Sequence, residues 1–343
     1  MKPAALVLLV ATGALAEDYD GKYKADARLA AVRGRLPGML REARTKIRVD
    51  GSVRVELRDL GKTRRGIVAK TVQDADGFVI VLYTEPLVLR MHAVAATLRH
   101  ELVHCLQKER WGARGEVTTP LWIKEGMAVY LSGQLEVRER ALAAHVGREP
   151  VPADAVARLV NGLGGRHTLL DYAEDGVAFA GAAKRHGAKK AQQFIDLLLA
   201  GVPPREATVR ALGERWEAFA ASSQKYARAR LDPLVREGRP QLLALRAAVE
   251  AEDYDTASSL PAATGVYAAD DAYYRARALR GLKRPADALK LLRARLLSTT
   301  PRTTTLLPLA VALEVELLAE LKRSPEHAIA LRNSRLDLEP FTD

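Results

Sequence analysis

The sequence predicts an α+β fold: a small β-sheet packed on helices, followed by an all-helical region. Three observations indicate this. Short apolar runs separated by turn residues lie within residues 53–83, a segment of helical period follows around His100, and almost everything beyond residue 240 has helical period. The chain of 343 residues is 48% hydrophobic, which is enough to bury the cores of two domains.

The first sixteen residues have the pattern of a secretory signal peptide. Met1-Lys2-Pro3 precedes an apolar run, and Ala14-Leu15-Ala16 forms a cleavage site of the A-x-A type. We expect cleavage after Ala16 and an exported, soluble protein, periplasmic or secreted. The alternative is an uncleaved membrane anchor, for which the apolar run is short. The single cysteine, Cys105, excludes an intramolecular disulfide and is expected to be a small buried residue.

The elements of the sheet region follow in order. Residues 25–46 have helical period, and an interruption at Pro37-Gly38 leaves open whether they form one helix or two. Strands are predicted at residues 53–57, 65–72 and 77–83, and the last is apolar throughout, which is typical of an interior strand. A helix then carries His100, and residues 113–120, after Trp111-Gly112, are predicted to be a loop.

The helix around His100 contains the pattern His-Glu-x-x-His. Because residues four apart lie on one helix face, His100 and His104 can direct imidazole nitrogens at a single metal ion. Glu101 lies about 100° further round, within reach of a metal-bound water without being a ligand. Two hydrogen-bonded histidines on an ordinary helix are the alternative. A buried stripe is predicted on the opposite side, formed by Val94, Leu98, Leu102 and Leu106.

Glu125 is the expected third ligand. It follows His104 by 21 positions, which leaves room for one loop and a returning helix. Two histidines and a glutamate, with one position left for water, form a common catalytic zinc site. The alternative for Glu125 alone is a solvated glutamate, but Gly126 and Ala128 permit close packing of its helix. We therefore expect zinc as the cofactor, with His100, His104 and Glu125 as its ligands.

Two segments resemble the signature blocks of the peptidase MA-like gluzincins, a family of zinc metallopeptidases. Residues 98–107 (LRHELVHCLQ) resemble the family's H-E-L-x-H helix, and residues 120–130 (PLWIKEGMAVY) resemble its W-x-x-E-G-x-A-x-Y block, whose glutamate is the third zinc ligand. Residues 172–198 are similar to the helix pair that closes the family's domain. The resemblance covers roughly residues 50–230 and implies a zincin-like fold and zinc-dependent hydrolysis of peptide bonds.

The resemblance also implies a donor for the oxyanion that develops during hydrolysis. Tyr172 stands where gluzincins bring in such a group, with His167 as the second candidate and a structural role for Tyr172 as the alternative. Tyr130 is expected to belong to the scaffold. At Val129 the sequence departs from family members that have an acidic residue to orient a zinc-binding histidine, so the resemblance identifies no orienting residue here.

The C-terminal part is predicted to be a separate domain. Residues 206–231 are expected to form one amphipathic helix, and the Pro and Gly residues at 232–240 mark a boundary between a zincin-like domain at residues 17–235 and an α-helical domain at residues 236–343. Turns are predicted at residues 259–261, 283–285, 300–301 and 324–325. Ala257, Ala288 and Ala328 align with spacings of 31 and 40 residues, on either side of the tetratricopeptide period of about 34. A tetratricopeptide-like module for a protein partner and a plain helical cap both remain open.

The expected function is an exported zinc metallopeptidase that hydrolyses a peptide or protein substrate, with Glu101 as general base. The alternative is a zincin-like scaffold without turnover that carries a protein-binding helical repeat. The net charge of +11 is spread along the chain without a nucleic-acid-binding motif, so neither nucleic acid nor stable membrane insertion is expected. Because histidine ligands must be neutral to bind a metal, we expect the metal to be lost when the pH falls below the histidine pKa of about 6.5.

Overall fold

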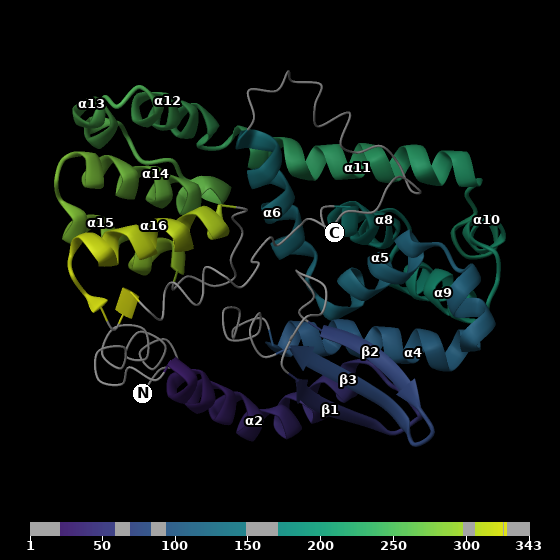
Figure 1. The fold of residues 1–343 in the computed structure, drawn as a ribbon. Coiled ribbons are helices and arrows are strands. Elements are labelled where there is room, and N and C mark those ends of the chain that lie inside the picture. The colour runs from purple at the N-terminus through teal and green to yellow at the C-terminus, as the bar shows by residue number, and fades with distance from the viewer. Residues whose placement is uncertain are drawn as a thin grey trace.

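The computed structural model describes residues 21–58, 69–83, 94–148, 171–297, 306–324 and 326–327 (Figure 1). Over these residues the fold is α+β, as the sequence predicts, with one three-stranded sheet and a larger set of helices. The expected signal peptide at residues 1–16 lies outside them. None of the described helices is both long enough and apolar enough to cross a membrane.

The sheet is built from β1 (Val53–Arg58), β2 (Ala69–Asp74) and β3 (Gly77–Tyr83). Strand β3 is central, parallel to β1 and antiparallel to β2, and the predicted turn at residues 74–77 joins β2 to β3. The prediction of an interior strand is confirmed. Phe78, Ile80 and Leu82 pack into the core on one face of β3, and Val79 and Val81 are buried on the other.

Two long helices, α2 (Gly21–Lys46) and α4 (Val94–Thr118), lie beside the sheet (Figure 1). Helix α2 continues through Pro37, so the Pro37-Gly38 pair does not divide it. The predicted buried stripe of α4 is confirmed at Val94, Leu98 and Leu102, and Leu106 is partly buried against the same core. The opposite face of α4 is therefore available for the two histidines.

The prediction of a loop at residues 113–120 is wrong as far as Thr118. Helix α4 continues to Thr118, and only Gly112 inside it leaves helical geometry, with φ of 63° and ψ of −178°. Glycine adopts this conformation without a Cβ clash, so the chain kinks there and the helix resumes. Two residues separate the end of α4 from the next helix, which begins at Leu121 as predicted.

The helices that follow α4 are α5 (Leu121–Ser132), α6 (Leu135–Arg148), α8 (Asp171–His186), α9 (Ala188–Leu199), α10 (Pro204–Ala207), η2 (Thr208–Leu212) and α11 (Trp216–Arg236). The single helix predicted at residues 206–231 is wrong, because Gly213 takes a left-handed conformation with φ of 73° and ends η2 before α11 begins. An aromatic cluster with neighbouring ring centroids 5.5–6.0 Å apart joins α5, α8, α9 and α11: Trp122, Phe179, Phe194, Trp216 and Phe219.

The C-terminal region consists of α12 (Arg239–Glu250), α13 (Tyr254–Ser259), η3 (Gly265–Tyr267), α14 (Ala268–Gly281), α15 (Pro285–Leu292), η4 (Arg293–Leu297) and α16 (Leu307–Glu320). The predicted turns at residues 259–261 and 283–285 fall at helix ends, whereas residues 300–301 and residue 325 of the turns predicted at 300–301 and 324–325 lie outside the described ranges. Glu252, Lys283 and Lys322 follow α12, α14 and α16 respectively, each with a positive φ between 55° and 61°. In every case the next N–H bonds back to a carbonyl five residues earlier.

The same local structure therefore recurs three times in this region: a helix ends, one residue takes a left-handed conformation, and helical residues follow. Ala257 and Ala288 occupy the same place after their turns, and both side chains are fully buried. Ala328 lies outside the described residues. Measured between the left-handed residues, the spacings are 31 and 39 residues, close to the 31 and 40 expected from the alanines.

The buried apolar side chains form two main clusters. One joins the sheet to α2, α4, α5, α8 and α9, and the other joins the C-terminal helices to α6 and the second half of α11. Tyr267 lies at the centre of the second cluster and donates its hydroxyl proton to the carbonyl of Val235 at 2.7 Å. A Cβ on Gly147 would fall within 1.6 Å of that hydroxyl. The core around α6 is therefore completed by a residue from beyond the predicted boundary.

Candidate metal centre

Helix α4 places the two histidines one turn apart on one face. The Nε2 atoms of His100 and His104 are 3.1 Å apart, and the rings meet edge to face at an interplanar angle of 80°. Both side chains are largely buried, with 10% and 16% of their surface exposed. The helical spacing therefore brings two imidazole nitrogens to one point, as the sequence predicts.

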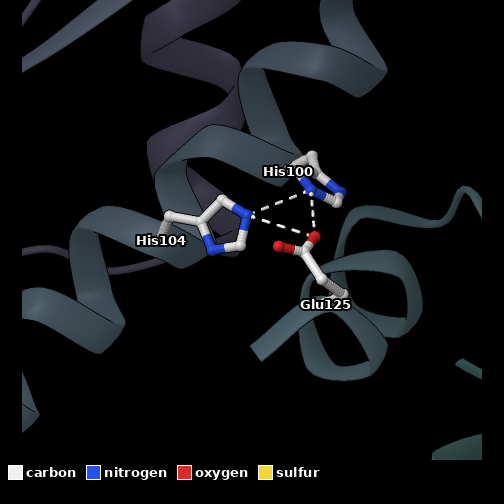
Figure 2. Close-up of side chains that lie close together, drawn as sticks. All are labelled: His100, His104 and Glu125. Atoms are coloured by element: carbon white, nitrogen blue, oxygen red, sulfur yellow. Dashed lines mark hydrogen bonds and ion pairs between the residues drawn. The ribbon is translucent and has the colours of Figure 1, made fainter. Parts of the chain in front are cut away.

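Glu125 reaches the same point from α5 (Figure 2). Its Oε2 atom lies 3.2 Å from Nε2 of His100 and 3.5 Å from Nε2 of His104. Helix α5 can pack this closely on α8 because the residue after the glutamate is Gly126, whose Cβ position would lie 2.6 Å from the carbonyl oxygen of Asp175 on α8. Glu125 is not a solvated glutamate, which was the alternative, because only 12% of its side chain is exposed.

The three atoms fit a tetrahedral metal ion. Donors at the corners of a tetrahedron around zinc, each about 2.0–2.1 Å from it, lie about 3.3–3.4 Å from one another. The observed triangle has sides of 3.1, 3.2 and 3.5 Å. Among the described residues, these three form the group of histidine, cysteine and acidic side chains whose donor atoms converge. Imidazole and carboxylate are both ordinary zinc donors, so the chemistry of the set also fits.

Burial and the histidine–glutamate contacts shift the pKa values of the site residues in opposite directions. Burial lowers the pKa of His104, but the charge and hydrogen bond of Glu125 outweigh it and raise that pKa to about 9. Burial also raises the pKa of Glu125, whereas the two histidines hold it far below its usual range. Without a cation the site is therefore an imidazolium–carboxylate pair at neutral pH. A metal that binds there has to displace the proton of His104.

Glu101, the expected general base, is buried between α4 and the sheet. The hydroxyl of Thr71 on β2 donates to its Oε2 at 2.8 Å and lies 3.0 Å from its backbone carbonyl. Only 7% of Glu101 is exposed, and its negative charge contributes to the raised pKa of His104. The carboxylate is thus close enough to act electrostatically on the site without belonging to the converging donors.

Gln107 is a residue of the site that the sequence analysis did not assign. Its Oε1 lies 2.8 Å from Nδ1 of His104, and its Nε2 donates to the carbonyl of Lys124 at 2.9 Å. The side chain is 2% exposed. The signal in the sequence was its position three residues after His104, which puts both side chains on one helix face.

The other predicted residues are accounted for as follows. Tyr172 belongs to the first turn of α8, but its side chain, like His167, is outside the described part of the chain. Tyr130 stacks on Phe179 with centroids 6.2 Å apart, in keeping with a scaffold role. Cys105 is fully buried as predicted, and burial raises its thiol pKa to about 12, so that the thiol stays protonated.

Comparison of the chain with protein-family models, with curated proteins and with solved structures found no match. Identification of the site therefore depends on its own geometry and on the two motif blocks at residues 98–107 and 120–130. Fold-level analogy to a named relative adds nothing to it.

Proposed function

We propose that this chain is an exported zinc metallopeptidase of the gluzincin type, with a zincin-like domain followed by a tetratricopeptide-like region. The observation that carries the proposal is the triangle of His100 Nε2, His104 Nε2 and Glu125 Oε2. Structural zinc sites have four protein ligands, whereas three protein ligands and a position for water are usual in catalytic sites. The likeness of residues 98–107 and 120–130 to the gluzincin blocks supports the same function.

The chemistry follows from the residues around the triangle. Zinc held there supplies a Lewis acid that activates water and polarises a peptide carbonyl. The carboxylate of Glu101 accepts the proton of the attacking water and delivers it to the nitrogen of the leaving amine. Thr71 keeps that carboxylate ordered through its hydroxyl. Tyr172, or His167 in its place, is proposed to donate a hydrogen bond to the oxyanion.

The test is to measure zinc content and cleavage of casein for the wild-type protein and for Glu101→Gln. The variant should keep its zinc and lose roughly two to four orders of magnitude in rate, the range that general-base catalysis provides. Glu109→Gln is the matched control, since Glu109 is on the same helix and also accepts hydrogen bonds from another element, including the N–H of Gly51 at 2.7 Å. Zinc binding with an unchanged rate in Glu101→Gln would remove the mechanism.

A zincin-like scaffold without turnover is the second candidate function. The three equivalent turns at Glu252, Lys283 and Lys322 favour it, because repeated helical units commonly form protein-binding surfaces. A wild-type protein that binds zinc but cleaves neither casein nor a mixed peptide library would support this candidate. Export is a separate part of the proposal, and N-terminal sequencing of the mature protein should begin at Glu17.

A further inference from the structure

The amide of Gln107 connects the two helices that carry the candidate ligands. On one side it contacts the imidazole of His104 on α4, and on the other it donates to the carbonyl of Lys124 on α5, the residue that precedes Glu125. The amide is buried, so each of its polar atoms needs a partner within the protein. One side chain thus joins an imidazole of the site to the peptide unit next to its carboxylate.

The chemistry of these partners fixes the direction of both hydrogen bonds. A backbone carbonyl can only accept, so the amide nitrogen of Gln107 must face Lys124 and the amide oxygen must face His104. An amide oxygen can only accept, so Nδ1 of His104 must carry the proton. The neutral imidazole is then protonated at Nδ1, and its lone pair is on Nε2, the atom that points at His100 and Glu125.

We propose that Gln107 is a positioning residue for the metal centre: it holds His104 in the Nδ1–H form with Nε2 directed at the cation. The inference rests on the proposed zinc site and supplies the orienting residue that Val129 does not provide. Metal-binding histidines commonly donate their second ring N–H to a carbonyl or carboxylate, and removal of that partner typically costs 10–100-fold in metal affinity. A residue that only linked α4 to α5 would affect the packing of the two helices, whereas a positioning residue affects the orientation and protonation of the His104 imidazole.

Arg99 offers a matched control for the difference. Its Nε donates to the carbonyl of Ser132 at 2.8 Å, so it is also an α4 side chain that bonds to an α5 carbonyl. Its contact is at the far end of α5 from Lys124 and involves none of the three ligands. A variant at Arg99 loses a link between the same two helices and leaves the imidazole of His104 with its acceptor.

The experiment measures zinc affinity at neutral pH, by competition with a chromophoric chelator, for the full chain and three variants. Gln107→Leu should bind zinc about 10–100-fold more weakly than wild type, and Arg99→Leu should stay within about threefold. Gln107→Glu keeps an acceptor for the Nδ1 proton of His104 but cannot donate to the carbonyl of Lys124. It should recover most of the lost zinc affinity if the contact with His104, and not the link to α5, is what matters. NMR of the imidazole nitrogens should show His104 protonated at Nδ1 in zinc-loaded wild type.

Each contrary result has a distinct meaning. Unchanged affinity in Gln107→Leu, an equal loss in Arg99→Leu, or a loss in Gln107→Glu as large as that in Gln107→Leu would overturn the positioning role. If Gln107→Leu does not fold, the imidazole NMR of the zinc-loaded wild type still decides, because a His104 protonated at Nε2 and not at Nδ1 would overturn the positioning role. A wild-type protein that binds no zinc would refute the proposed function itself.

Discussion

The contact of Gly126 with α8 determines how closely α5, the helix that carries Glu125, packs on α8. A Cβ at residue 126 would lie 2.6, 2.7 and 2.9 Å from the carbonyl oxygen, carbonyl carbon and Cβ of Asp175. Two of these are backbone atoms, which cannot rotate away, so α5 and α8 would have to separate by about 0.8 Å to reach an ordinary contact of 3.4 Å. Overpacking of this kind costs about 1–3 kcal/mol, and the better helix propensity of alanine returns about 0.5–1 kcal/mol.

Gly126→Ala should therefore lower the free energy of unfolding by about 1–2 kcal/mol and weaken zinc binding, because Glu125 moves with its helix. Gly34→Ala is the matched control, since Gly34 is exposed on helix α2 with no atom within 4 Å of its Cβ position. That variant should gain about 0.5–1 kcal/mol. Urea unfolding measures both. A Gly126→Ala protein as stable as wild type, with unchanged zinc affinity, would refute the packing argument.

Two further predictions concern charged side chains. When a chelator keeps the site free of metal, the raised pKa of His104 stabilises the folded protein, and this contribution is fully present below the unfolded pKa of 6.5. It amounts to at most about 3.4 kcal/mol and is lost as the pH rises through about 9. Urea unfolding at pH about 6 and about 10 measures the loss, which should be smaller in Glu125→Gln; an equal loss in the variant contradicts the assignment. Arg230→Met leaves the carboxylate of Glu139, which is 1% exposed, without its cation and should cost about 2 kcal/mol, whereas Arg236→Met at an exposed ion pair should cost less than about 0.5 kcal/mol. If Arg230→Met and Arg236→Met lowered the free energy of unfolding equally, the buried ion pair of Arg230 with Glu139 would not contribute more to stability than the exposed one.

Local patterns were enough to predict the sheet and the histidine pair. Strand β3 could be recognised because it is apolar at every position from Phe78 to Tyr83, and His100 and His104 because their spacing matches one helical turn. The approach of Glu125 depends on tertiary packing, but Gly126 is a visible sign that its helix is closely packed. These features have causes that lie within a few residues of the chain.

Other features depend on atoms that a sequence does not reveal. The partner of Gln107 is a backbone carbonyl on another helix, and carbonyls carry no sequence signal. Gly112 and Gly213 both have positive φ, yet ψ is −178° at the first, where the helix resumes, and 16° at the second, where it ends. Which of these conformations a glycine takes depends on the surrounding packing. The turns at Glu252, Lys283 and Lys322 have no glycine at the left-handed position, so only Gly281 and the prolines near two of the turns indicated where they lie.

The phenol of Tyr267 also constrains how this chain can evolve. Its hydroxyl occupies the space that any side chain at residue 147 would need, and its ring lies among residues from both sides of residue 236. Recombination at that point would leave a hole in one product and an uncovered apolar face on the other. A side chain larger than glycine at residue 147 therefore requires a smaller side chain at residue 267, and an exchange at residue 236 would separate parts that share one core.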